Sequence, residues 1–153
     1  MQFRIVVVGR PRDAGLASLI HDYESRAGRY WPVTVTEVRE EPGRRGTESS
    51  TVIAREGDRL LAAAAGRIIT CDARGRTLDS HAFAAWIQQL REDARDVSFV
   101  IGGANGLATA VLDAAESRLA LAPWTLPHEI ARLVLAEQLY RAGTIGRGEP
   151  YHK

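Results

Sequence analysis

The sequence predicts an α/β fold with a mainly parallel sheet and helices on both of its faces. Short runs of β-branched residues alternate with helical segments along the chain, which is typical of parallel strands joined by right-handed crossovers. The run Val97–Ile101 is apolar without alternation, as expected for a central strand covered on both faces. With 153 residues and no internal repeat or linker-like stretch, the chain is expected to form a single domain, 1–153.

Five strands are expected, and turns that contain glycine follow three of them. The strands are predicted at 3–8, 33–38, 67–71, 97–101 and about 119–121. The second alternates in part, which favours a place near an edge of the sheet. The glycine turns are at Gly9, at 72–76 and at 102–106, and glycine lets a backbone turn sharply beside a ligand. Because the carboxyl ends of parallel strands share one edge, we expect a pocket there.

Helices are expected between these strands and after the last one. Apolar residues at helical spacing indicate a helix over 14–26, one from Ser49 or Ser50 to about residue 65, and one capped by Asp79 or Ser80. Two further helices are predicted at 109–116 and 128–142. Between the second strand and the second helix, residues 40–50 are polar and rich in glycine, which predicts a loop.

The composition excludes several functional classes. Hydrophobic residues make up 45% of the chain and charged residues 25%, and the net charge is +1. Proteins that bind bare nucleic acid by bulk electrostatics are usually strongly basic, so an RNA partner would be met through a local patch. No apolar run approaches the ~20 residues of a membrane span. The single cysteine, Cys71, fits a reducing compartment. We therefore expect a cytoplasmic protein that binds neither membrane nor metal.

Two irregular segments are candidates for the walls of a ligand pocket. The first, 102–106, follows the buried strand, and by itself it is equally typical of a plain strand-to-helix turn. The second, 122–127, contains Pro123 and Pro127, which restrict an irregular loop to few conformations. Such a loop can present backbone amides and carbonyls to a flat ligand such as adenine.

Three separated motifs stand out: IGGANG at 101–106, LAPWTLPHEIARLVLAEQLYRA at 121–142 and the terminal EPYHK. Together they resemble the RlmH (YbeA-type) family of the SPOUT methyltransferase superfamily. The sequence at 44–46 also matches the KRG-type loops of that family in part. The resemblance spans essentially the whole chain. It implies a small homodimer with a trefoil knot in its C-terminal part (an α/β-knot), although threaded chains are so rare that the pattern alone would predict an open sheet.

The resemblance also implies an activity and a cofactor. Members of this family methylate the N3 atom of a pseudouridine in large-subunit ribosomal RNA, on the assembled ribosome, with S-adenosyl-L-methionine. Positions that contact the cofactor in the family correspond here to Cys71, Gly102, Gly103, Ala122, Pro123, Trp124, Thr125, Leu126 and Pro127. Two departures from the family stand out. Cys71 replaces a common leucine, and Ala104-Asn105 replaces a frequent Pro-Glu, so a catalytic carboxylate in this loop is in doubt.

Candidates for the chemistry lie in the C-terminal segment. Methyl transfer from a sulfonium needs alignment of donor and acceptor and a nucleophilic nitrogen. A ring imide loses its proton at roughly pH 9 to 10, close to the acidity of tyrosine, so a base or a nearby positive charge would help. We expect His152 to act as base, Arg141 or Lys153 to stabilise the developing oxyanion, and Tyr151 to stack on or orient the RNA base. His128 is expected to support the loop or the helix start, and Glu137 to pair with an arginine across the dimer.

RNA-facing residues and a dimer interface are expected elsewhere on the surface. Arg44 and Arg45 form a pair in the polar loop, and guanidinium groups match phosphate oxygens. The neighbouring Glu40 and Glu41 leave open the alternative of a solvated loop with incidental charge. With Arg141, the expected phosphate-facing set comprises Arg44, Arg45, Arg147 and Lys153. Apolar residues such as Leu133 and Leu135 lie on different sides of the last helix, which favours a dimer interface.

Two alternatives stay open at the level of sequence. A SPOUT enzyme that acts on another RNA, such as transfer RNA, would have the same pocket. A non-catalytic ribosome-associated factor could keep the fold without activity, and Asn105 in place of a carboxylate is the one feature in its favour. A Rossmann-type nucleotide enzyme is disfavoured, because Gly9-Arg10-Pro11 after the first strand lacks the Gly-x-Gly-x-x-Gly pattern.

Overall fold

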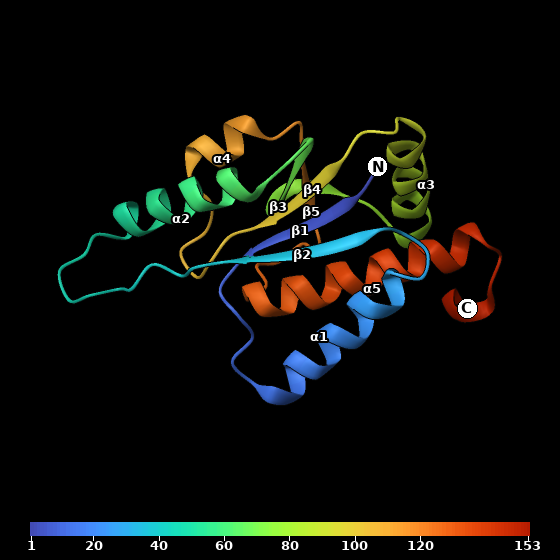
Figure 1. The fold of residues 1–153 in the computed structure, drawn as a ribbon, viewed down its shortest axis with the longest axis horizontal. Helices are drawn as coiled ribbons and strands as arrows, with labels where there is room; N and C mark the ends of the chain where they lie inside the picture. The colour runs from blue at the N-terminus through green and yellow to red at the C-terminus, as the bar shows by residue number, and fades with distance from the viewer.

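The computed structural model describes residues 1–153 and contains one five-stranded sheet (Figure 1). Its strands lie in the order β2-β1-β4-β3-β5, and every pair of neighbours is parallel. The strand bounds are β1 Phe3–Val8, β2 Val33–Val38, β3 Arg67–Thr77, β4 Val97–Ile101 and β5 Ser117–Ala120. The predicted parallel α/β fold is therefore confirmed.

The positions of the strands in the sheet follow their sequences. All five residues of β4 are buried, and the strand lies in the centre between β1 and β3. β2 has no fully buried residue and lies at an edge, as its partial alternation predicts. In β1 the run FRIVVV is buried on both faces, with Phe3 aligned between Val33 of β2 and Val97 of β4.

Helices cover both faces of the sheet (Figure 1). Their bounds are α1 Ala14–Ala27, α2 Ser49–Ala63, α3 Ser80–Glu92, α4 Thr109–Ala114 and α5 His128–Gly146, and a 3₁₀ turn, η1, covers Pro150–His152. Helices α1, α3 and α5 pack on the face that carries Phe3, Ile5 and Val7 of β1. Helices α2 and α4 pack on the opposite face, which carries Val6 and Val8. Because successive side chains of a strand point to opposite faces, β1 contributes alternate residues to the two cores.

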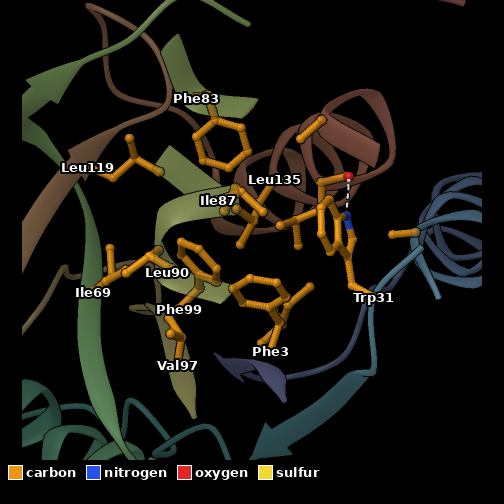
Figure 2. Packing of buried hydrophobic residues seen from close by; sticks show 14 of the residues in the cluster. Phe3, Trp31, Ile69, Phe83, Ile87, Leu90, Val97, Phe99, Leu119 and Leu135 are labelled. Atoms are coloured by element: carbon orange, nitrogen blue, oxygen red, sulfur yellow. Dashed lines mark hydrogen bonds between the residues drawn. The ribbon is translucent and has the colours of Figure 1, made fainter. Parts of the chain in front are cut away.

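The larger core contains an aromatic cluster around Phe3 (Figure 2). The ring of Phe3 meets that of Trp31 edge-on with centroids 5.8 Å apart, and the ring of Phe99 at 6.0 Å. The indole Nε1 of Trp31 donates a hydrogen bond of 2.8 Å to the carbonyl oxygen of Leu139 in α5. This bond satisfies the one polar atom of a buried indole and attaches α5 to the segment before β2.

Several predicted boundaries differ from the structure. β3 continues beyond residue 71 to Thr77, with an irregularity between Cys71 and Arg76, so the predicted turn at 72–76 is a bulge within a strand. Asp72 and Gly75 are typical of turns as well as of bulges, so the residue types at 72–76 do not distinguish the two. Helix α2 has Glu48 at its N-cap, without a side-chain hydrogen bond, instead of Ser49 or Ser50. α4 ends at Ala114, β5 covers Ser117–Ala120, and α5 extends to Gly146.

Other elements match their predicted signals. Asp79 caps α3 by accepting a hydrogen bond of 2.7 Å from the amide of Ala82. None of the helices combines the length and the apolar character that a membrane crossing requires. The threaded path of the C-terminal segment stays a prediction.

Candidate functional site: a cavity at the carboxyl edge of the sheet

A cavity of about 830 Å³ lies beside the bulge of β3 and the ends of β4 and β5. Its walls come from the bulge of β3 at 71–74, from the glycine loop 102–106 after β4, and from the proline loop 122–127 after β5. The start of α5 closes it with His128 and Ala131, and ten of its 18 lining residues are hydrophobic. The size and the apolar walls are those of a site for a small organic ligand.

Eight of the nine residues predicted to contact the cofactor line this cavity. They are Cys71, Gly102, Gly103, Ala122, Trp124, Thr125, Leu126 and Pro127. Pro123 does not line it, so its predicted contact is not supported by the geometry. Sequence reasoning missed Asp72 and Arg74, because the bulge that turns them toward the cavity was interpreted as an ordinary turn.

The glycine loop is tightly closed on itself. The amide of Gly106 donates a hydrogen bond of 3.1 Å to the carbonyl of Gly103, and Gly106 has a φ of +91° that favours glycine. A Cβ at Gly102 would lie 2.8 Å from the carbonyl oxygen of Gly106. The loop therefore presents bare backbone to the cavity, and side chains at 102 or 106 would disturb its turn.

The polar groups in the cavity wall have distinct electrostatic states. Arg74 donates to both carboxylate oxygens of Asp72, at 3.1 and 2.8 Å from its side chain. These hydrogen bonds hold the pKa of Asp72 below its usual range, so this carboxylate stays ionised. Burial raises the pKa of the Cys71 thiol to about 12. Cys71 is thus a neutral apolar contact instead of a nucleophile.

The residues predicted to perform the chemistry lie at the other end of α5. Arg141 donates two hydrogen bonds, of 3.0 and 2.6 Å, to Oε1 of Glu137 one turn earlier. The phenol of Tyr151 donates to the same oxygen at 3.0 Å. The ring of His152 packs edge-on against His81 of α3 with centroids 5.4 Å apart, and its Nδ1 is buried without a hydrogen-bond partner. The structure thus brings Arg141 and Tyr151 together, whereas His152, next to Tyr151 in the chain, packs against α3.

Two details of this cluster bear on the predicted roles. Burial, together with hydrogen bonds to Tyr23 and Glu137, raises the pKa of Tyr151 far above its ordinary value. Tyr151 is thus a neutral donor, which suits an orienting group and not a base. Glu137 pairs with Arg141 of its own chain, because the two are four residues apart on one helix face. Its pairing with an arginine across a dimer stays a prediction.

The cavity and the C-terminal cluster are far apart within one chain. His128 lines the cavity at the start of α5, and Arg141 lies 13 residues further along the helix. At 1.5 Å per residue this separates them by about 20 Å. Figure 1 shows the C-terminus at the end of α5 that points away from the glycine loop. A single chain therefore does not combine its predicted cofactor and catalytic residues.

The predicted RNA-facing residues form two groups. Arg44 and Arg45 are exposed in the loop 39–48, which we call the arginine loop; it projects from the body of the protein between β2 and α2 (Figure 1). Arg147 and Lys153 are exposed near the C-terminus. Arg147 stacks over the ring of Tyr30 at 4.6 Å. No group of three or more His, Cys, Asp or Glu side chains is arranged to hold a metal ion.

Comparison with known proteins identifies the family. A family model described as "Predicted SPOUT methyltransferase" matches residues 1–152. The chain belongs to the SPOUT methyltransferase family. A relative from Gemmatimonas aurantiaca, "Ribosomal RNA large subunit methyltransferase H", is 59% identical over 155 residues and covers 100% of both chains. The family resemblance predicted from the three sequence motifs is thus confirmed.

Solved structures of low sequence identity share the fold. A probable methylase family protein from Haemophilus influenzae is 15% identical, with a TM-score of 0.55 over 99% of this chain and 70% of the other. A methyltransferase from Legionella pneumophila, solved with the bound cofactor S-adenosylmethionine, is 13% identical. Its TM-score is 0.51 over 93% of this chain and 66% of the other. These two neighbours share the α/β architecture of the sheet.

Proposed function

We propose that this protein transfers a methyl group from S-adenosyl-L-methionine to the N3 atom of a pseudouridine in large-subunit ribosomal RNA. Membership of the SPOUT methyltransferase family over residues 1–152 is the observation that carries the proposal. The full-length relative that is 59% identical is named as a methyltransferase of large-subunit ribosomal RNA. The cavity at the carboxyl edge of the sheet supports the same reaction, since it has the size and polarity that a nucleoside-like cofactor needs.

The cavity fits the cofactor in shape and chemistry. The cofactor supplies an activated methyl group on a cationic sulfur. Apolar walls from Leu121, Leu126 and Ala131 suit the two faces of a flat adenine ring, and the bare backbone of the glycine loop allows close approach. Asp72 and Arg74, which line the same cavity as an ion pair, add polar groups to an otherwise largely apolar wall. Cys71, Gly102, Gly103 and the proline loop would hold the cofactor in place.

A homodimer is part of the proposal, because one chain separates the cavity from the C-terminal cluster by about 20 Å. In a dimer the C-terminal segment of one protomer would reach the cavity of its partner. Half-buried apolar residues on α5, such as Ile130, Leu133 and Val134, provide an interface. There His152 would accept the N3 proton, Arg141 would stabilise the anion of the ring, and Tyr151 would orient the base.

The assembled ribosome is the proposed substrate, and the cytoplasm the proposed location. With a net charge of +1, the protein is not held on RNA by overall charge attraction. It suits a folded partner surface that is recognised by its shape and by several local contacts. The exposed side chains of Arg44, Arg45, Arg147 and Lys153 would contact phosphates around the target base.

Methyl transfer from labelled S-adenosylmethionine tests the function directly. Purified protein is incubated with intact ribosomes that lack the modification, with isolated large-subunit RNA and with transfer RNA. We expect label in one pseudouridine of the ribosome and little in the other two substrates. Label in transfer RNA alone would favour the other SPOUT activity. Cofactor binding without transfer to any RNA would favour a non-catalytic ribosome-associated factor.

Mixing two inactive variants tests the shared site. A variant with Gly102→Val blocks the cavity, and a variant that lacks 151–153 removes the C-terminal residues. If each site combines parts of two chains, refolded mixtures regain up to about a quarter of wild-type activity, because half of the dimers are mixed and each has one complete site. Light scattering gives the mass in parallel. Mixtures that stay inactive while the mass is that of a dimer would contradict the shared site.

A further inference from the structure

Glu56 is a buried charged residue that the proposed reaction does not use. It lies on α2, and only 3% of its surface is exposed. The other buried residues of this helix are Val52, Gly57 and Leu60, and Leu60 belongs to the smaller core. A carboxyl group in such a place costs free energy unless its oxygens are hydrogen-bonded. Its contacts therefore call for an explanation.

One oxygen of Glu56 holds the base of the arginine loop. Its Oε1 accepts a hydrogen bond of 3.1 Å from the amide of Glu41. The side chain of Glu41 is in turn bound by two arginines of the same helix, Arg55 at 2.7 Å and Arg59. These hydrogen bonds keep the pKa of Glu41 below its usual range, so the ion pairs persist at neutral pH. Three residues on adjacent turns of α2 thus fix the start of the loop that carries Arg44 and Arg45.

The other oxygen lies against the glycine loop of the cavity. Oε2 of Glu56 is buried and has no hydrogen-bond partner. A Cβ built on Gly103 would lie 2.7 Å from this oxygen and 3.1 Å from Cγ1 of Val8. Only glycine leaves room for this contact without a shift of the loop or of Glu56. Gly103 itself lines the cavity, whereas Glu56 does not.

We propose that Glu56 is a positioning residue that joins the arginine loop to the glycine loop, so that the RNA-facing arginines keep a fixed place relative to the bound cofactor. This inference rests on the proposed function, because it assigns the cavity to the cofactor and the arginine loop to RNA. Glu56 acts through its two neighbours and not on the reacting atoms, since it lies behind the wall of the cavity. A methyl donor and its acceptor must be aligned closely, so the relative placement of these two loops affects transfer.

The buried position of Glu56 favours the neutral form of its carboxyl group. Burial raises its pKa above the ordinary value, and the nearby Glu40 acts in the same direction. The amide of Glu41 and the charges of Arg59 and His128 oppose this shift. A glutamine at position 56 has the size of the neutral acid and keeps an oxygen for the amide of Glu41. Alanine keeps neither contact.

The experiment compares Glu56→Ala, Glu56→Gln and the control Asp58→Asn, whose side chain is exposed on the same helix. Calorimetry gives the Kd for S-adenosylmethionine, and initial rates on ribosomes give KM and kcat. We expect Glu56→Ala to weaken cofactor binding about tenfold and to raise the KM for ribosomes by a similar factor. In Glu56→Gln the Kd for S-adenosylmethionine and the KM for ribosomes stay within about threefold of wild type, and in Asp58→Asn both are unchanged.

Combination with Arg44→Ala/Arg45→Ala separates positioning from loss of stability. If Glu56 places the arginines, their removal raises the KM for ribosomes less in the Glu56→Ala background than in the wild type. Strictly additive effects on KM, or wild-type cofactor affinity in Glu56→Ala, would overturn the proposal. A wild-type protein that bound no cofactor would instead refute the proposed function.

A second variant keeps the inference testable if Glu56→Ala does not fold. Gly103→Ala pushes on Glu56 from the side of the cavity. We expect it to speed hydrogen exchange at the amide of Glu41, although residue 103 makes no hydrogen bond to that amide. Gly146→Ala, at the end of α5, has open space for its Cβ at an ordinary backbone conformation and serves as the control. Exchange at Glu41 that is the same in Gly103→Ala and the control would contradict the link.

Discussion

The phenol of Tyr151 donates a hydrogen bond of 3.0 Å to Glu137, the same carboxylate that binds Arg141. One acidic residue thus holds two of the three groups assigned to the chemistry. Because Tyr151 is a neutral phenol with a raised pKa, it contributes no titration to the reaction near neutral pH. Its role is to set geometry, and it requires Glu137 as its acceptor.

We therefore expect Tyr151→Phe to raise the KM for ribosomes by roughly three- to tenfold and to leave the shape of the pH–rate profile unchanged between about pH 6 and about pH 9. His152→Gln, by contrast, should lower kcat and remove a pH-dependent limb from the profile. Initial rates over this pH range test both variants. A limb lost in Tyr151→Phe and kept in His152→Gln would reverse the assigned roles.

Arg132 forms the most buried ion pairs in the chain. Its guanidinium donates to Glu24 of α1 at 2.6 and 3.2 Å and to Glu37 of β2 at 2.7 Å, with 7% of its side chain exposed. Replacement by methionine would leave the carboxylate of Glu24 without a partner and that of Glu37 with the exposed Arg10 alone. We therefore expect a loss of about 3–5 kcal/mol in the free energy of unfolding. Arg12→Met, which removes an exposed pair with Glu40, should cost less than about 1 kcal/mol. Urea denaturation measures both, and equal losses would contradict the difference in burial.

Trp124 lines the cavity and is 70% exposed, which is unusual for a large aromatic residue. Cofactor binding should bury it and change its fluorescence, whereas Trp31 in the core and Trp86 on α3 are remote from the cavity. We expect Trp124→Phe to abolish most of the signal and Trp86→Phe to retain it. Trp124→Ala should weaken cofactor binding roughly three- to tenfold through lost stacking. A signal that persists in Trp124→Phe would place the cofactor elsewhere.

The sequence predicts most of the fold because its signals are local. Val97–Ile101 is a buried strand by its apolar run, and Asp79 caps α3 as its position before the helix suggests. The cavity walls follow from the rule that the carboxyl ends of parallel strands meet. Asp72 and Arg74 were missed because their bulge depends on pairing with β5, which is distant in sequence. Glu56 carries no sequence signal at all: on a helical wheel it is one more charged residue, and only the fold places it against Gly103.

Ionisation of Glu56 should make stability depend on pH. In the unfolded chain its carboxyl has an ordinary pKa near 4.3, whereas burial raises the pKa in the folded protein. Below the ordinary pKa both states hold the proton and nothing is lost. As the pH rises through the ordinary pKa toward the folded value, the unfolded chain releases its proton first, so the free energy of unfolding falls.

Glu56→Gln cannot ionise, so its gain in Tm over the wild type should grow from nearly zero at about pH 4 to a plateau above the folded pKa. The charge of His128 acts on the same carboxyl and lowers its pKa. The comparison is therefore repeated in a His128→Gln background, where the pH-dependent gap should persist. Thermal unfolding of the wild type, Glu56→Gln, His128→Gln and the double variant across this pH range measures the four Tm profiles that test the prediction. If the difference in Tm between Glu56→Gln and the wild type does not vary with pH, the pKa of Glu56 is not raised in the folded protein. Glu56 would then be ionised there, and its Oε2 would need a hydrogen-bond or ion-pair partner.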